Sequence, residues 1–231
     1  MKKKGNTAAR AVLFDFGGTL DGDGLHWPLR FHIAYREAGG EVAFRDFESL
    51  FKSVDRDLAE LPKIRTMGQR AAIAATAALL IERLPDGGDV NVVRVIDTLH
   101  TAVLATIARN RPMLERLAAR YRLGVVSNFT GNLEPCLAEL GIRPLFQSLA
   151  DSTLVGAAKP DPKIFHVVLD ELDVKPEDTW MVGDNPEADI RPAALLGMRT
   201  IWLAPESRPT PEGLKPTKRV AKLTDIESYL D

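Results

Sequence analysis

The sequence has few of the features that place a protein in a membrane, outside the cell or on nucleic acid. It has one cysteine in 231 residues, Cys136, which rules out an internal disulfide and suits a reducing compartment. Its longest apolar run, residues 71–81, is far short of the roughly 20 residues that span a bilayer. A formal net charge of −2 gives no reason to expect nucleic acid as a partner. The start of the chain is basic but no signal-type apolar stretch follows it, so we expect a cytoplasmic protein with no membrane partner.

Histidine and cysteine do not form a recognisable metal site. The four histidines, His26, His32, His100 and His166, show no metal-ligand spacing. Cys136 lies in a helix-like stretch, where a small buried residue is a better interpretation than a nucleophile. A metal, if one is used, must therefore be held by oxygen ligands.

Short continuous apolar segments are what the sequence does contain. Residues 11–17, 123–128, 179–184 and 199–204 are of this kind, residues 145–151 are a weaker case, and helix-like stretches follow each of them. This alternation predicts an α/β fold with a Rossmann-like, mainly parallel sheet flanked by helices. Function in such sheets gathers at the carboxyl ends of the strands, where Asp15, Ser127, Asn128 and Asp184 fall.

One region interrupts the alternation. Between about residues 22 and 109 there is no convincing strand, and apolar residues recur at helical spacing in 27–39, 43–61, 64–84 and 90–108. A helical block inserted after the first strand is expected to act as a lid over the strand ends. We therefore predict a core of residues 1–21 and 110–231 and an all-helical cap of residues 22–109.

Four short motifs follow one another along the predicted core. They are "DFGGT" from Asp15 to Thr19, "VVSN" ending in Ser127 and Asn128, "AAKPDPKIF" with Lys159, and "MVGDNPEADI" with Asp184 and Asp189. Each is weak alone, since Ser127 or Asn128 could cap a helix and Asp189 could favour a helix dipole. In this order and at these spacings the chain resembles the haloacid dehalogenase-like hydrolase superfamily, most of whose members are phosphatases.

The resemblance implies a role for each motif residue. Asp15 would attack phosphorus and form an aspartyl-phosphate, with Lys159 as a positive charge beside it. Mg²⁺, which prefers hard oxygen ligands, would be the cofactor. Its implied ligands are Asp15, Asp184, the Gly17 carbonyl, and Asp189 directly or through water. Phosphate oxygens would be held by Ser127, Asn128 and Thr19, together with backbone N–H groups.

The family pattern at the first motif has a second aspartate, which acts as general acid and base, and this chain has Gly17 there. General acid–base catalysis contributes ~10²–10⁴-fold, so the expectation is a weakened phosphatase that favours good leaving groups such as aryl or acyl phosphates. Asp23 or His26, a few residues on, could supply the proton instead.

Three other functions stay open at this stage. A 2-haloacid dehalogenase also uses an aspartate nucleophile and needs no acid, although Asp184 and Asp189 keep the metal pattern. A non-catalytic protein that binds a phospholigand or a partner would explain the lost acid but not the retained Asp15. A phosphotransferase is the third. The expected partner is a small phosphate ester; the sequence leaves its identity and the oligomeric state open, with a monomer favoured.

Overall fold

The protein is built on one parallel sheet. The computed structural model describes residues 10–230; the basic start of the chain, on which the expectation of no signal sequence depends, lies outside them except for Arg10. Within the described residues six strands pair in the order β3-β2-β1-β4-β5-β6, all parallel. Their bounds are β1 Ala11–Phe14, β2 Arg122–Ser127, β3 Ser148–Asp151, β4 Thr179–Gly183, β5 Arg199–Leu203 and β6 Lys218–Val220. The predicted fold class is confirmed, and the five predicted segments all contain strands.

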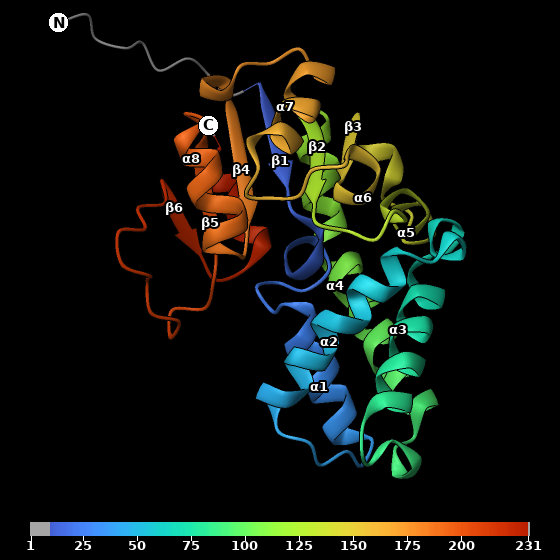
Figure 1. Ribbon diagram of the computed structural model, residues 1–231. Helices are drawn as coiled ribbons and strands as arrows, with labels where there is room; N and C mark the ends of the chain where they lie inside the picture. The colour runs from blue at the N-terminus through green and yellow to red at the C-terminus, as the bar shows by residue number, and fades with distance from the viewer. Residues whose placement is uncertain (1–9, 231) are drawn as a thin grey trace, which may run out of the picture.

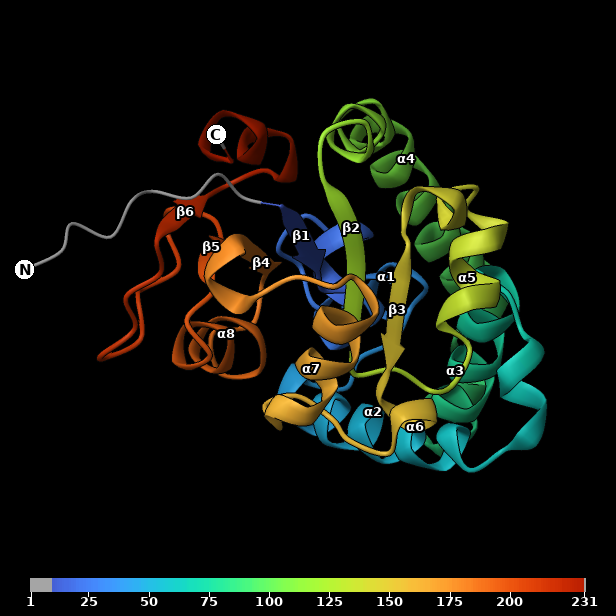
Figure 2. The ribbon, with the colours of Figure 1, turned by 90° about the horizontal axis from the view of Figure 1, so that it is seen from above.

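Both faces of the sheet are covered by helices (Figure 2). Because strand side chains alternate between faces, Leu13 packs with residues of α7 (Pro162–Glu171), whereas Val12 and Phe14 belong to a second cluster. That second cluster includes residues of α5 (Leu133–Glu139) and the end of α4 (Val92–Ala118). The shorter helices α6 (Ser152–Val155) and α8 (Arg191–Leu195) follow β3 and β4.

Residues 22–109, all of which the structure describes, contain helices and no strand, as the sequence predicts. The elements are α1 (Trp27–Glu37), α2 (Phe44–Ala59), α3 (Gln69–Arg83) and the first two thirds of α4. Figure 1 shows this helical layer beyond the carboxyl ends of the strands, and α4 continues from it to the sheet without a break at residue 110. Among the described helices, none combines the length and the apolar character needed to cross a membrane.

One strand was not predicted. β6 begins at Lys218 and pairs with β5 at the edge of the sheet. It has only three residues, two of them basic, so neither alternation nor an apolar run marks it.

Candidate active site

Asp15 lies at the centre of the sheet, directly after β1. Its neighbours on either side are the ends of β2 and β4, and its N–H donates to the Val182 carbonyl at 2.9 Å. The chain then turns sharply through Gly18, whose φ of 95° favours glycine. This turn brings the Thr19 hydroxyl back to donate to the Asp15 carboxylate at 3.3 Å and to that of Asp184 at 3.4 Å.

Lys159 reaches the same point from the loop before α7. Its ammonium donates to the Oδ1 atoms of Asp15 and of Asp189, each at 2.6 Å, and its side chain is only 2% exposed. Burial alone would lower the pKa of Lys159, but the two carboxylates outweigh it and raise that pKa above its ordinary value. Lys159 is therefore a buried cation held between two carboxylates.

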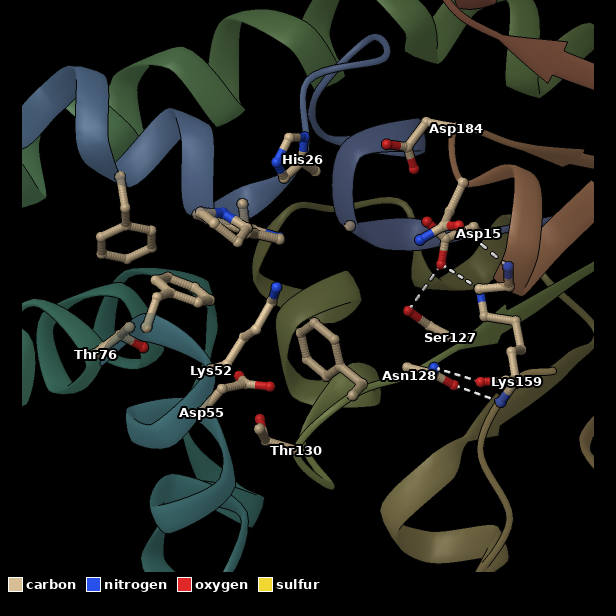
Figure 3. Close-up of a pocket in the computed structure, with 18 of the residues that line it drawn as sticks. Asp15, His26, Lys52, Asp55, Thr76, Ser127, Asn128, Thr130, Lys159 and Asp184 are labelled. Carbon is tan, nitrogen blue, oxygen red and sulfur yellow. Dashed lines mark hydrogen bonds and ion pairs between the residues drawn. The ribbon is translucent and has the colours of Figure 1, made fainter. Parts of the chain in front are cut away.

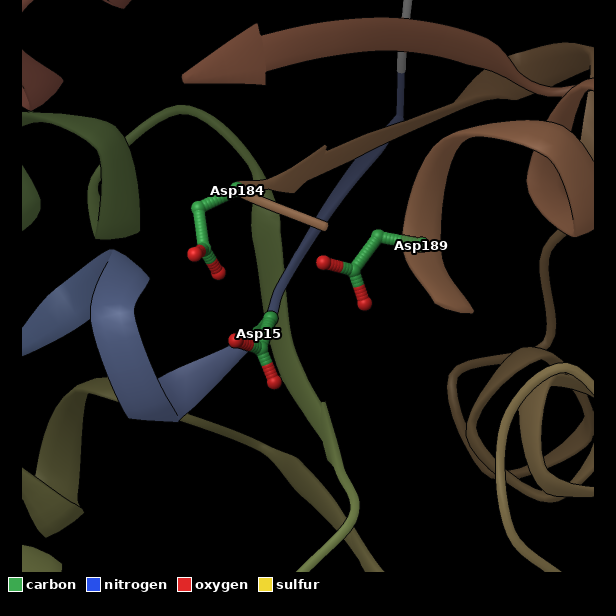
Figure 4. Close-up of side chains that lie close together, drawn as sticks. All are labelled: Asp15, Asp184 and Asp189. Atoms are coloured by element: carbon green, nitrogen blue, oxygen red, sulfur yellow. The ribbon is translucent and has the colours of Figure 1, made fainter. Parts of the chain in front are cut away.

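Three buried carboxylates meet beside this lysine (Figure 4). Asp15, Asp184 and Asp189 each offer an oxygen within 4.8 Å of the others. Burial, followed by the negative charges of Asp15 and Asp189, raises the pKa of Asp184 well above its ordinary value. Burial also raises the pKa of Asp189 to about 6, although Lys159 opposes the shift. Three acidic groups against one lysine leave excess negative charge on hard oxygen ligands, which fits a divalent cation such as Mg²⁺.

Ser127 and Asn128 both lie at the end of β2 but make different contacts (Figure 3). The Ser127 hydroxyl donates to Asp15 Oδ1 at 3.1 Å. The Asn128 amide instead exchanges two hydrogen bonds with the backbone of Lys159: Nδ2 donates to the carbonyl at 3.0 Å, and Oδ1 accepts from the N–H at 2.7 Å. In this arrangement the side chain predicted to bind phosphate orients the lysine loop.

Gly17 faces an indole ring. A Cβ added at Gly17 would lie 2.9 Å from Cδ1 and 3.1 Å from Nε1 of Trp27, the first residue of α1. The φ of −75° and ψ of 106° at Gly17 suit any L residue, so space rather than backbone strain limits this position. The sequence gives no signal for this contact, because nothing in the helical periodicity relates residue 27 to residue 17.

The two suggested replacements for the missing acid differ in position. Asp23 is held away from the site: its carboxylate accepts from Arg109 at 2.7 Å and from the Leu223 N–H at 3.0 Å. His26 lines the same cavity as Asp15, with its ring edge-on to Phe44 at 6.3 Å. Burial lowers the pKa of His26, which keeps the imidazole neutral at neutral pH.

The cavity above Asp15 measures about 560 Å³ and lies between the strand ends and the helical layer. Its walls on the sheet side include Asp15, Gly17, Ser127, Lys159 and Asp184. The helical side supplies side chains that sequence reasoning did not single out, among them Trp27, Phe31, Phe51, Lys52, Asp55 and Thr76. As far as the structure describes the chain, the walls include none of Lys63, Arg65 and Arg70, three cations of the helical layer.

The site combines an aspartate, a lysine and an acidic cluster at the carboxyl ends of the strands of a Rossmann-like sheet. This is the arrangement of the class of hydrolases that the family comparison identifies. Residues 9–197 match the family model described as haloacid dehalogenase-like hydrolase, and the chain belongs to this family.

Curated relatives include phosphatases and a nucleotidase. A phosphoserine phosphatase of Thermus thermophilus is 38% identical over 90 residues, which is 39% of this chain and 36% of that protein. Pyrimidine 5'-nucleotidase YjjG of Escherichia coli is 34% identical over 121 residues, 51% of this chain and 53% of that protein. The chain thus matches about half or less of the length of these relatives.

Solved structures share the fold over nearly the whole chain. The magnesium-bound HAD-hydrolase YfnB from Bacillus subtilis is 22% identical with a TM-score of 0.61, covering 97% of this chain and 100% of that chain. A dehalogenase structure is 20% identical with a TM-score of 0.65, covering 96% of this chain and 97% of that chain. At these identities the likeness concerns the fold alone.

Proposed function

We propose that this protein is a Mg²⁺-dependent hydrolase of small phosphorylated compounds that works through an aspartyl-phosphate on Asp15. The observation that carries the proposal is the convergence of Asp15, Ser127, Lys159, Asp184 and Asp189 in one buried cluster at the floor of a cavity. A carboxylate beside a buried lysine and two further carboxylates has the parts for phosphoryl transfer, which depends on positioning and charge neutralisation.

The proposal assigns the two layers different tasks. Residues 1–21 and 110–231 would form the catalytic core, and residues 22–109 a cap that selects the substrate. The cavity between the layers supports this division, since helices α1 to α3 supply much of its wall. A site enclosed in this way suits a small phosphate ester as substrate.

Mg²⁺ would be held by Asp15, Asp184, the Gly17 carbonyl, and Asp189 directly or through water. When bound it would neutralise charge on the phosphoryl oxygens. The excess negative charge of the carboxylate cluster supports this assignment.

The side chains present account for formation of the aspartyl-phosphate better than for its hydrolysis. An Asp15 carboxylate oxygen attacks phosphorus, and the bond from phosphorus to the leaving oxygen breaks. Ser127, Thr19 and the Lys159 ammonium would hold the phosphoryl oxygens. Gly17 offers no proton to the leaving oxygen and no base to the water that must later cleave the aspartyl-phosphate. Phosphorylation of Asp15 by an ester with a good leaving group should therefore be fast, and hydrolysis of the aspartyl-phosphate should be slow.

A rapid-quench experiment with p-nitrophenyl phosphate and Mg²⁺ tests the proposal. We expect a burst of about one p-nitrophenolate per protein followed by a slow steady state, and no burst in Asp15→Asn. Absence of a burst with aryl and acyl phosphates would contradict the proposal and favour a protein that only binds its ligand. Halide release from 2-haloacids without Mg²⁺ would identify a dehalogenase instead.

A further inference from the structure

Trp27 borders both the nucleophile turn and the helical wall of the cavity. It is the first residue of α1, is partly buried, and lines the cavity with one edge of its indole against Gly17. Its ring lies 5.5 Å from that of Phe31, which in turn lies 5.2 Å from that of Phe51. All three rings line the cavity and form an apolar wall on its helical side, and Phe129 adds a fourth ring from the segment after β2.

A buried ion pair holds this indole in place. The Arg30 guanidinium lies over the Trp27 ring, 4.4 Å from its centroid, and Arg30 Nη1 lies 3.1 Å from Asp21 Oδ2. Both charged residues are buried, since Asp21 is 0% exposed and Arg30 8%. The Asp21 carboxylate also accepts from the Gly18 N–H at 2.7 Å, in the turn that follows Asp15. Separating a buried ion pair is strongly destabilising, so Arg30 and the indole that it covers keep one position relative to this turn.

The geometry of the proposed reaction directs the leaving group toward the helical wall. In phosphoryl transfer the attacking and leaving oxygens lie roughly in line, with phosphorus between them. Asp15 attacks from the floor of the cavity, and Figure 3 shows Lys52 and Thr76, from the helical side, across the cavity from it. The leaving group therefore points away from the sheet. Within the three-ring wall, Trp27 is the ring that contacts the nucleophile turn, because it lies against Gly17.

Two independent properties of the site favour the same kind of leaving group. The lack of a carboxylate at residue 17 favours phenols and carboxylic acids, which depart without a proton, over alcohols. Aromatic rings pack against one another with a gain beyond that of their buried apolar area. We infer that the cavity selects phosphorylated compounds whose leaving group carries an aromatic ring, and that Trp27 is the residue that selects it. The inference rests on the proposed function, because it places the phosphoryl group at Asp15.

The test compares benzoyl phosphate with cyclohexanecarbonyl phosphate in the presence of Mg²⁺. Both leaving groups are carboxylates of similar size and basicity, so the two compounds differ mainly in whether the ring is flat and aromatic. Single-turnover rapid-quench measurements give the second-order rate constant of aspartyl-phosphate formation for each. We expect the wild type to react about two- to tenfold faster with benzoyl phosphate, the range expected for an aromatic pair. This preference should disappear in Trp27→Leu.

Three further variants serve as controls. Trp27→Phe keeps a ring and should keep a preference for benzoyl phosphate. Phe44→Leu removes a partly buried ring at the start of α2 that is not among the described cavity residues, and it should leave the preference unchanged. Melting temperatures show whether each variant is folded. Trp27→Met, which fills more of the volume of the indole, takes the place of Trp27→Leu if the latter is unfolded.

The failure of the inference and that of the proposed function are distinguishable. Equal rates in the wild type, a faster reaction with cyclohexanecarbonyl phosphate, or an unchanged preference in Trp27→Leu would overturn the inference, while formation of an aspartyl-phosphate leaves the proposed function intact. Absence of an aspartyl-phosphate with every compound would contradict the proposed function instead. Calorimetric titration with benzylphosphonate and cyclohexylmethylphosphonate, which cannot transfer their phosphoryl group, would then test the aromatic site alone. Tighter binding of benzylphosphonate, lost in Trp27→Leu, would support the inference, and equal binding would overturn it.

Discussion

Introducing an aspartate at residue 17 should supply acid–base catalysis only if Trp27, whose indole lies beside this position, is also replaced by a smaller residue. The backbone at Gly17 accepts an L residue, but the new Cβ would come within 2.9 Å of Trp27 Cδ1, closer than Cβ atoms approach other heavy atoms. In Gly17→Asp, either the indole is displaced or the new carboxylate is aimed away from the leaving group. Trp27→Leu removes the ring and opens that space.

The expected magnitudes separate the variants. An added general acid and base is worth ~10²–10⁴-fold on an unactivated alkyl phosphate, or roughly 3–5 kcal/mol of barrier. Overpacking against the indole costs about 1–3 kcal/mol of folding free energy. We therefore expect Gly17→Asp alone to melt at a lower temperature and to gain little activity, Trp27→Leu alone to gain none, and the double variant to approach the full gain. The two changes should be strongly non-additive because the side chains are in contact.

Rapid-quench kinetics with an alkyl and an aryl phosphate provides the assay. The gain of the double variant should be large on the alkyl ester and small on the aryl ester, whose leaving group needs little protonation. The burst expected of the wild type should merge into steady turnover, because the new base speeds cleavage of the aspartyl-phosphate. Asp15→Asn in the double-variant background is the blank. A wild type that hydrolyses alkyl phosphates rapidly would refute the reasoning, and so would a folded double variant that forms the aspartyl-phosphate without any gain.

Five further outcomes are expected. We expect calorimetry to detect Mg²⁺ binding by the wild type and none by Asp184→Ala; equal binding by both would exclude the proposed metal site. Because the folded-state pKa values of Asp184 and Asp189 are raised, that of Asp189 to about 6, Mg²⁺ must displace protons at low pH, and its affinity should fall as the pH drops through 6. The stability of the metal-free protein has the opposite pH dependence: it should fall as the pH rises from about 4 to above 6, and Mg²⁺ should raise the melting temperature most at the upper end. Asn128→Ala should slow the burst about tenfold with unchanged Mg²⁺ affinity, because it frees the backbone of Lys159. Burial raises the pKa of the Cys136 thiol, so thiol reagents should react with it only after unfolding.

The core and its acidic cluster were predictable because their signals are local. An apolar run that ends in a carboxylate places Asp15 and Asp184 at the carboxyl ends of strands in a parallel sheet, and the order of the motifs adds Lys159. Contacts across the cavity could not be predicted from the sequence. Asp55 is an ordinary acidic residue of an amphipathic helix until α2 is folded over the sheet. The hydrogen bonds of Asn128 depend on where the lysine loop lies, which no spacing specifies.

Gly17 and the ring beside it are best understood as a fitted pair. A site that had simply lost a carboxylate would keep a space where the side chain had been, but here an indole takes that space, and glycine is the residue that allows it. The buried charges of the cluster lower the stability of the fold. Burying Asp15, Lys159 and Asp189 without solvent removes the hydration of three charges, and apolar residues in their place would often be more stable. If Asp15 is the nucleophile that we propose, a fold that keeps Asp15 and Lys159 while filling the position of the acid fits phosphoryl transfer from a leaving group that departs without a proton.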